Sequence, residues 1–324
     1  MRITENSMTN RYLKNLQGNL SNLSNSNLKL TSKRKYNHVS EDVGNASRAF
    51  TVRTQINKNQ EQSNTVENAI GELNTASENV MTVSSVLKTV YSQAIKVQGA
   101  TTQENLDAIA ESLSGLKNEI LQTMNASYGD KFLFSGSGNT QAPFSLDTDG
   151  NLLFNGVKVD DASAATDFKE NKVVYLDVGF GMSSPGAVIG PQTGLKISTS
   201  GVDVLGFGME DGQPKNIYSL ISKMEDEIRS GDKEAAGKTL KVLQSKEENI
   251  SIALSEIGTR QNILDRTKDR LDGELLHLKE RQNSLESIDL EEESINNKSY
   301  EMAWMITLQL GSSVIPPSIF DFMR

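Results

Sequence analysis

Between residues 66 and 97 the sequence places an apolar residue at every third or fourth position without interruption. The repeat consists of Val66, Ala69, Leu73, Ala76, Val80, Val83, Leu87, Val90, Ala94 and Val97. A spacing that averages 3.5 residues is typical of long helices packed along a coiled-coil seam, and the alanines let a partner helix approach closely. We therefore expect a long helix that is buried along one side.

Two further stretches carry the same repeat. After a break at "GATTQEN" (99–105), in which Thr102 can cap a new helix, the apolar stripe resumes at Leu106 and continues to Ile120, which predicts a second, antiparallel helix. A longer repeat has fourteen positions, ten of them apolar: Leu240, Leu243, Glu247, Ile250, Leu254, Ile257, Gln261, Leu264, Lys268, Leu271, Leu275, Leu278, Gln282 and Leu285. A helix of this length spans about 70 Å. We expect this seam to pack beside the 66–97 seam in an elongated rod.

The segment between the helical stretches has a different composition. Residues 132–214 contain thirteen glycines and four of the six prolines, and their short apolar runs predict strands joined by turns. Asp149-Gly150 predicts a hairpin, because glycine supplies the positive φ of a tight turn. The same "DTDG" stretch hints at a calcium loop, but it lacks the full spacing of such loops, so we favour the turn.

The two ends of the chain carry short apolar stripes. Near the start are Leu13, Leu16, Leu20, Leu23 and Leu30, surrounded by asparagine and serine, which predicts a helix of marginal stability on its own. Residues 302–320 contain no charged side chain, but Pro316-Pro317 end the helix there, which leaves it too short to cross a membrane. We predict no membrane insertion and expect an assembly surface instead. Its C-terminal members are Ala303, Trp304, Ile306, Leu308, Leu310 and Val314, followed by Ile319, Phe320 and Phe322, which are expected to turn back onto a neighbouring chain.

These patterns predict a mainly α fold with a β insertion: an elongated rod of antiparallel coiled-coil-like helices, with both termini at one end and a small β-rich domain at the other. We expect residues 1–40 and 296–324 to form terminal assembly arms that are disordered in the isolated chain. Residues 41–134 and 215–295 form the predicted helical rod, and 135–214 the predicted outer β domain.

Composition argues against several classes of function. The net charge of −9 disfavours nucleic acid as a partner, and the dense basic run Lys33-Arg34-Lys35 is expected to be a solvated turn. The chain has no cysteine and only two histidines, and it lacks the common hydrolase, phosphate-loop and zinc-protease motifs. We expect no enzymatic activity, no cofactor and no metal site. The first ten residues lack an apolar stretch, so no cleaved signal peptide is expected.

Three motifs resemble a known family. "LKLTSKRKYNHVSEDVGNASRAFTVRTQI" (28–56) resembles the N-terminal segment of flagellins, although "TSKRK" stands where the family usually has "SSG" before a basic residue. "YGDKFLFSGSGNTQAPF" (128–144) and the ending "SIFDFM" (318–323) are more similar to hook-filament junction proteins of the hook-associated protein 3 type. The matches lie in the two helical arms and include almost nothing of the β-rich middle.

The resemblance implies a structural subunit of the bacterial flagellum that joins hook to filament. It implies an extracellular protein, exported unfolded by the flagellar type III apparatus and assembled through its terminal arms. The partners it implies are further copies of the chain, a neighbouring hook-associated junction protein, flagellin, and a dedicated export chaperone on the C-terminal arm. The alternatives are an exported coiled-coil adhesin or type III needle-tip protein, and flagellin itself.

Overall fold

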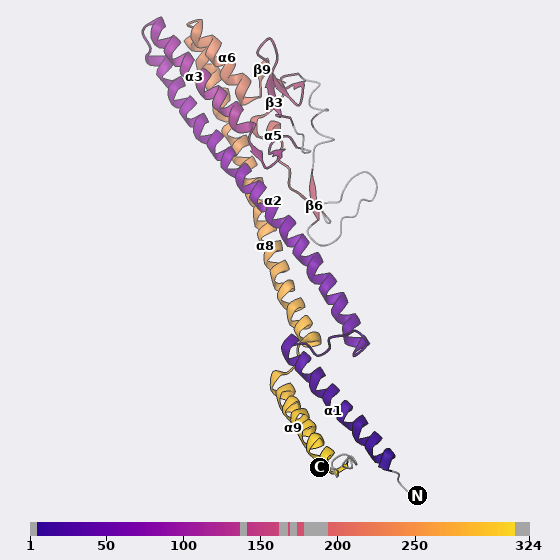
Figure 1. Cartoon of the computed structure of the whole chain (residues 1–324). Coiled ribbons are helices and arrows are strands. Elements are labelled where there is room, and N and C mark those ends of the chain that lie inside the picture. The colour runs from indigo at the N-terminus through magenta and orange to yellow at the C-terminus, as the bar shows by residue number, and fades with distance from the viewer. Residues whose placement is uncertain (1–4, 137–140, 162–167, 169–173, 178–193, 315–324) are drawn as a thin grey trace. The chain divides into compact units, whose positions relative to one another are not determined.

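The computed structural model describes residues 5–136, 141–161, 168, 174–177 and 194–314 (Figure 1). The chain forms two compact units. Residues 1–60 and 272–324 make the terminal unit, and residues 61–271 make the central unit. Helices α2 (Val43–Lys96) and α8 (Glu247–Glu286) contribute residues to both.

The terminal unit contains the first and the last helix of the described chain. Figure 1 shows α1 (Glu5–Ser32) and α9 (Leu290–Val314) lying side by side. They are antiparallel, because Asn19 of α1 is bonded to Thr307 near the end of α9, whereas Ser26 is bonded to Glu293 near its beginning. Segments far apart in the sequence are thus paired.

A β-bridge and a backbone hydrogen bond join the segment after α1 to the segment before α9. Arg34 and Ser287 form an antiparallel β-bridge, and the Lys35 amide donates to the Glu286 carbonyl at 2.7 Å. The Glu286 carboxylate is in turn paired with Arg53 of α2 at 2.6 Å. These contacts hold the ends of four helices of the terminal unit together.

Lys33, which follows the last residue of α1, has a φ of 55°. This is the left-handed conformation that glycine adopts most easily where a helix ends, and it costs another residue roughly 1 kcal/mol. The position is the one at which "TSKRK" departs from the usual "SSG" pattern. The turn therefore keeps a glycine-like backbone without the glycine.

The central unit is built around α2 and α8. All ten positions of the repeat from Val66 to Val97 are buried, as predicted. Three side-chain hydrogen bonds fix the register with α7 and α8: they join Tyr91 to the Leu243 carbonyl, Asn74 to Gln261, and Glu67 to Lys268, at 3.0, 2.7 and 3.0 Å. Residue numbers rise on one side as they fall on the other, so the helices are antiparallel. The predicted packing of the two seams is confirmed.

The prediction of one unbroken helix from Leu240 to Leu285 is wrong. The structure has two helices there, α7 (Lys233–Ser245) and α8, which separate at Lys246. Glu247 and Glu248 lie in the first turn of α8, where acidic side chains stabilise a helix start. A heptad count alone misses the break because it crosses a short helix junction without losing its phase.

Three shorter helices complete the helical part of the central unit. α3 (Gln103–Met124) begins after the short helix η1 (Val97–Gly99), and the Thr102 side chain accepts from the Asn105 amide, as predicted. α6 (Ile217–Arg229) packs on α3, and a half-buried ion pair between Lys117 and Glu225, at 2.8 Å, joins them. α7 in turn packs on α6.

The described part of the 132–214 segment and its borders form small antiparallel sheets. The strands are β1 (Ser127–Tyr128), β2 (Lys131–Phe132), β3 (Phe144–Leu146), β4 (Leu152–Phe154), β5 (Val157–Lys158), β6 (Tyr175–Asp177), β7 (Gly194–Lys196), β8 (Met209–Glu210) and β9 (Gln213–Pro214), with the short helix α5 (Gly201–Leu205) among them. The sheets pair as β1-β2, β3-β4-β5, β6-β7 and β8-β9. The predicted mainly α fold with a small β region is confirmed.

The "DTDG" stretch forms the turn between β3 and β4. One oxygen of the Asp147 carboxylate accepts from the amides of Asp149 and Asn151, and Gly150 has the positive φ, 83°, that the turn requires. Lys158 pairs with the other oxygen at 3.1 Å. These hydrogen bonds hold the pKa of Asp147 below its usual value. The carboxylate is thus used to close the turn, as we favoured.

Candidate assembly interface

The α1–α9 pair contains the residues that the sequence assigns to assembly. Residues of α1 that are at least partly buried recur at spacings of four and three: Tyr12, Leu16, Asn19, Leu23, Ser26 and Leu30. Residues of α9 follow the same spacing: Glu293, Asn297, Tyr300, Trp304, Thr307 and Gly311. Two heptad stripes thus face each other, which is the geometry of a two-helix coiled coil.

The seam between these helices is unusually polar. The Asn19 amide donates to the Thr307 hydroxyl at 2.8 Å, and Ser26, which is fully buried, donates to the Glu293 carboxylate at 2.7 Å. Asn297 donates to both Ser26 and Asn27. Polar residues at seam positions fix the register of a coiled coil and lower its stability. The pair is therefore specific in its alignment but weak.

At one end of the seam an aromatic ring packs against the backbone of α9. The Tyr12 ring lies so close to Gly311 that a Cβ on Gly311 would overlap its hydroxyl group. A side chain at this position would therefore have to displace the Tyr12 ring. The contact fixes the last described turn of α9 against the beginning of α1.

The N-terminal leucine stripe divides between two surfaces. Leu16, Leu23 and Leu30 belong to the seam, whereas Leu13 and Leu20 are 43% and 50% exposed on the flank of α1. The seam therefore coincides with the predicted leucine stripe at every second position. At the positions between, the seam residue lies one residue before the predicted leucine. The leucines that were expected to form one face are thus partly inside the pair and partly outside it.

The predicted C-terminal interface residues are placed in a similar way. Ala303 and Trp304 are half-buried, whereas Ile306, Leu308 and Leu310 are exposed. Val314 is the last residue of α9. Ile319, Phe320 and Phe322 lie outside the described residues.

Further apolar side chains are exposed on the same two helices. They are Met8 and Leu28 on α1 and Leu290, Ile295, Met302 and Met305 on α9. Sequence analysis missed them because each lies off the predicted stripe. These residues could have been found in the sequence, because each helix carries apolar residues on several sides. A single partner helix covers only one side, so the others must stay exposed.

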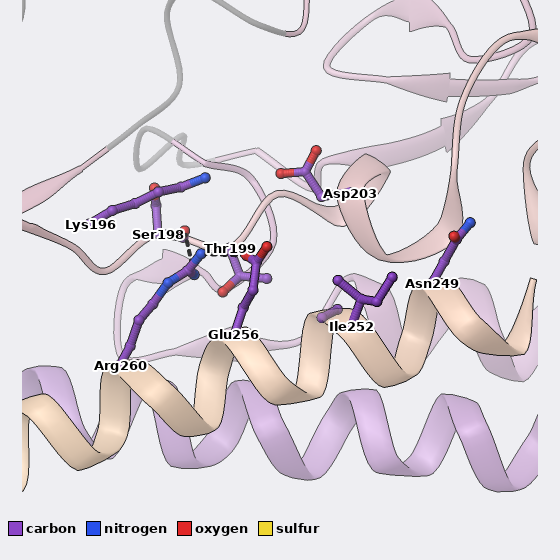
Figure 2. A pocket seen from close by; sticks show the side chains of 9 residues that line it. Lys196, Ser198, Thr199, Asp203, Asn249, Ile252, Glu256 and Arg260 are labelled. Atoms are coloured by element: carbon purple, nitrogen blue, oxygen red, sulfur yellow. Dashed lines mark hydrogen bonds and ion pairs between the residues drawn. The ribbon is translucent and has the colours of Figure 1, made fainter.

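A small cavity lies in the central unit beside α8 (Figure 2). It has a volume of about 100 Å³, and Arg260 at its edge donates to the Ser198 carbonyl at 3.3 Å and pairs with Glu256 at 2.8 Å. Asp203 also lines it, and burial raises the pKa of this carboxyl group. A cavity of this size holds a few water molecules, and its charged groups join the segment after β7 to α8.

The described residues also bear on two other kinds of feature, metal sites and membrane spans. Within them, no group of three or more histidine, aspartate or glutamate side chains is placed to hold a metal ion. None of the helices in the described ranges has both the length and the apolar character needed to span a bilayer.

The N-terminal part of the chain matches a known protein family. Residues 3–139 match the family described as the bacterial flagellin N-terminal helical region. This N-terminal segment is flagellin-like. The match includes all of α1, α2 and α3, so the helix that supplies one side of the seam lies in the matched segment. No curated protein matches the sequence significantly.

Solved structures share the fold of this flagellin-like chain. A protein of Vibrio parahaemolyticus described as flagellar hook-associated is 16% identical, with a TM-score of 0.59 over 76% of this chain and 100% of that one. FlgL of Bacillus cereus is 14% identical, with a TM-score of 0.53 over 72% and 99% of the two chains. Hook-associated protein 3 of Legionella pneumophila is 14% identical, with a TM-score of 0.50 over 72% and 98%. The resemblance indicated by the sequence motifs is confirmed.

Proposed function

We propose that this chain is a structural subunit of the bacterial flagellum and forms an axial layer that joins the hook to the filament. The flagellin N-terminal region supports a place in the flagellar axis. The shared fold with hook-associated proteins, together with the "YGDKFLFSGSGNTQAPF" and "SIFDFM" motifs, favours the junction over flagellin itself. No observation favours an adhesin or a needle-tip protein.

The observation that carries this proposal is the distribution of polar and apolar residues in the α1–α9 pair, whose seam contains polar residues while apolar residues of the same helices are exposed. Its seam buries Ser26 and partly buries Asn19 and Thr307, while Leu20 and Ile306 remain 50% and 57% exposed. Burying one such aliphatic side chain stabilises a structure by about 1.5–3 kcal/mol. The exposed aliphatic side chains of this helix pair can therefore stabilise an assembly when neighbouring chains bury them.

The partners follow from this arrangement. Further copies of the chain cover the exposed residues of the α1–α9 pair in the axis, and a neighbouring hook-associated protein and flagellin contact the two sides of the layer. The terminal arms are disordered before assembly and order on contact, which suits export of an unfolded chain by a type III apparatus to the cell exterior. The weak polar seam supports this part of the proposal.

An export chaperone binds the C-terminal arm before assembly. Exposed apolar side chains such as Ile306 and Leu308 promote aggregation unless a partner covers them. An amphipathic helix that docks its apolar face into a groove is a common way to achieve this. Replacing Ile306 by serine should therefore weaken chaperone binding as well as assembly.

The test of the junction role uses a pair of serine substitutions on the exposed flank of α1. Leu13→Ser with Leu20→Ser removes two exposed apolar side chains and leaves the seam residues unchanged. In a flagellated host that lacks its own junction protein, we expect normal export of the variant, hooks without filaments, and flagellin in the medium. Gln17→Ser is the matched control, because it changes an exposed polar residue of the same helix. Normal filament numbers with the double variant would contradict the proposal.

A further inference from the structure

The two long helices of the central unit carry apolar residues that their own seam leaves uncovered. On α2, Met81 and Ile95 are 51% and 60% exposed, and on α8, Ile252 and Ile263 are 52% and 37% exposed. Successive residues of a helix are rotated by about 100°, which places all four on a side of their helix away from its buried residues. These outward sides belong to the central unit and not to the terminal arms.

The exposed residues follow heptad spacing on both helices. The stripe on α2 consists of Met81, Ser85, Lys88, Ser92 and Ile95, all of them exposed. The stripe on α8 consists of Glu248, Ile252, Ser255, Thr259 and Asn262, also all exposed, and Ile263 follows directly. Spacings of four and three residues keep such a set on one side of a helix, which is the side that a partner helix covers in a coiled coil. Each helix thus has a second stripe besides its buried seam.

The stripe on α8 lies along a groove. Glu248, Ile252, Ser255 and Thr259 are among the residues that line it, and its volume is about 520 Å³. Ile252 also lines the small cavity of Figure 2. The short side chains of Ser255 and Thr259 let another backbone approach α8 closely, and Ile252 supplies an apolar wall. A groove of this kind along a helix fits the ridge of side chains on a second helix.

We propose that α2 of a neighbouring copy occupies this groove in the assembled layer. This inference rests on the proposed junction function. Within one chain α2 and α8 are antiparallel, so copies that share one orientation along an axis bring α2 of one copy antiparallel to α8 of the next.

One antiparallel alignment matches the apolar residues of the two stripes. It places Ile95 beside Ile252, Ser92 beside Ser255, and Met81 beside Ile263. The two apolar residues are roughly 21 Å apart on α2 and roughly 17 Å apart on α8, and the flexible methionine side chain spans the difference. The small serine layer between them allows the helices to come close.

The charges of the two stripes support the same alignment. Lys96 directly follows Ile95 on α2, and Glu248 lies one turn before Ile252 on α8. The alignment therefore brings an exposed ammonium group of one copy to an exposed carboxylate of the next. Opposite charges at the rim of an interface select the partner and its register more than they add affinity.

The contact joins two different surfaces, so every copy offers one of each. Such a heterologous contact continues from copy to copy into a ring or a helical array, whereas a contact between identical surfaces closes as a dimer. An axial layer needs the first kind. Two apolar contacts separated by serines are too few to hold free chains together, so we expect this contact only where the terminal arms already hold the copies side by side.

Disulfide formation tests the contact, because the chain has no cysteine of its own. The full chain with Ser92→Cys and Ser255→Cys is produced in a flagellated host that lacks its own junction protein, and isolated hook-filament particles are oxidised. Gln261 lies opposite Asn74, so Ser255 lies roughly 18 Å from Ser92 along the helices of one chain. A disulfide between these two positions therefore forms only between copies.

We expect a ladder of dimers, trimers and larger multimers. It should be several-fold more intense than for Ser92→Cys with Asp265→Cys, whose second cysteine is exposed on another side of α8. Filaments without this excess over the control would overturn the contact and leave the junction role intact, and so would a dimer band alone, which indicates pairing of identical surfaces. If the unsubstituted chain restores no filaments, the junction role fails and this contact fails with it.

A charge exchange provides an independent measurement. Glu248→Lys should lower the number of filaments per cell several-fold, and Lys96→Glu added to the same chain should restore most of them. Glu248 lies in the first turn of α8 and Lys96 in the last turn of α2, where each original charge stabilises its own helix. A purely structural role therefore makes the double variant worse than either single variant. The proposal is wrong if the double variant forms no more filaments than Glu248→Lys alone.

Discussion

Leu264 should be one of the most sensitive positions of the central unit. Its side chain is 0% exposed, and it lies on α8 between the Asn74–Gln261 and Glu67–Lys268 hydrogen bonds that align α8 with α2. Leu264→Ala removes three buried carbons and leaves a cavity in a rigid helix seam, at a cost of about 3 kcal/mol. For a unit of this size each kcal/mol lowers Tm by about 2–4 °C, so we expect a decrease of about 6–12 °C.

Ile263 provides the matched control. It is the adjacent residue of the same helix and is 37% exposed, so Ile263→Ala should cost less than about 1 kcal/mol. Calorimetry of both variants measures the two shifts under identical conditions. Leu264→Asp, which places a charge in the seam, should lower Tm further than Leu264→Ala. If the two alanine variants melt at the same temperature, the argument from seam burial fails.

Three further outcomes follow from individual contacts. Lys33→Gly should raise the free energy of unfolding of the terminal unit by about 0.5–1 kcal/mol, since glycine adopts the positive φ without strain; urea unfolding measures the gain, and a loss would contradict the strain. Gly311→Val should separate α9 from Tyr12 and speed amide exchange in α9, and unchanged exchange rates would refute the close contact. Burial raises the pKa of Asp160, so the folded state keeps a proton that the unfolded state has lost. The stability that Asp160 contributes should therefore fall as pH rises above about 4, and Asp160→Asn should remove this part of the pH dependence in urea unfolding.

The long helix of the central unit was predictable because the repeat positions of its 66–97 stretch are all apolar. Because every position of the repeat from Val66 to Val97 is apolar, the sequence indicates which face of the helix is buried, and the structure buries that face. The break at Lys246 was not predictable in this way, because the heptad phase is preserved across it. Which strands pair was also beyond the sequence, since runs of two or three residues carry almost no periodic signal.

The candidate interface was predictable in its elements but not in its phase. The sequence correctly identifies a leucine-bearing first helix and a last helix that is uncharged from Met302 onward, yet the seam uses Asn19 and Ser26 rather than Leu13 and Leu20. Hydrophobic periodicity assumes that apolar residues face the partner helix of the same chain. That assumption fails where hydrogen bonds set the alignment and apolar side chains remain outside.

This division of chemistry explains how one chain can be stable at one set of helices and adaptable at another. The α2–α8 seam buries aliphatic residues such as Leu87 and Leu264 completely, so separating those helices costs many kcal/mol. The α1–α9 seam relies on hydrogen bonds such as Asn19–Thr307, which contributes only about 1 kcal/mol net because water offers the same bonds to the separated helices. The polar seam therefore selects a register without making the pair permanent. In the proposed assembly, contacts of Leu20 and Ile306 with neighbouring copies would supply the stabilisation that the polar seam lacks.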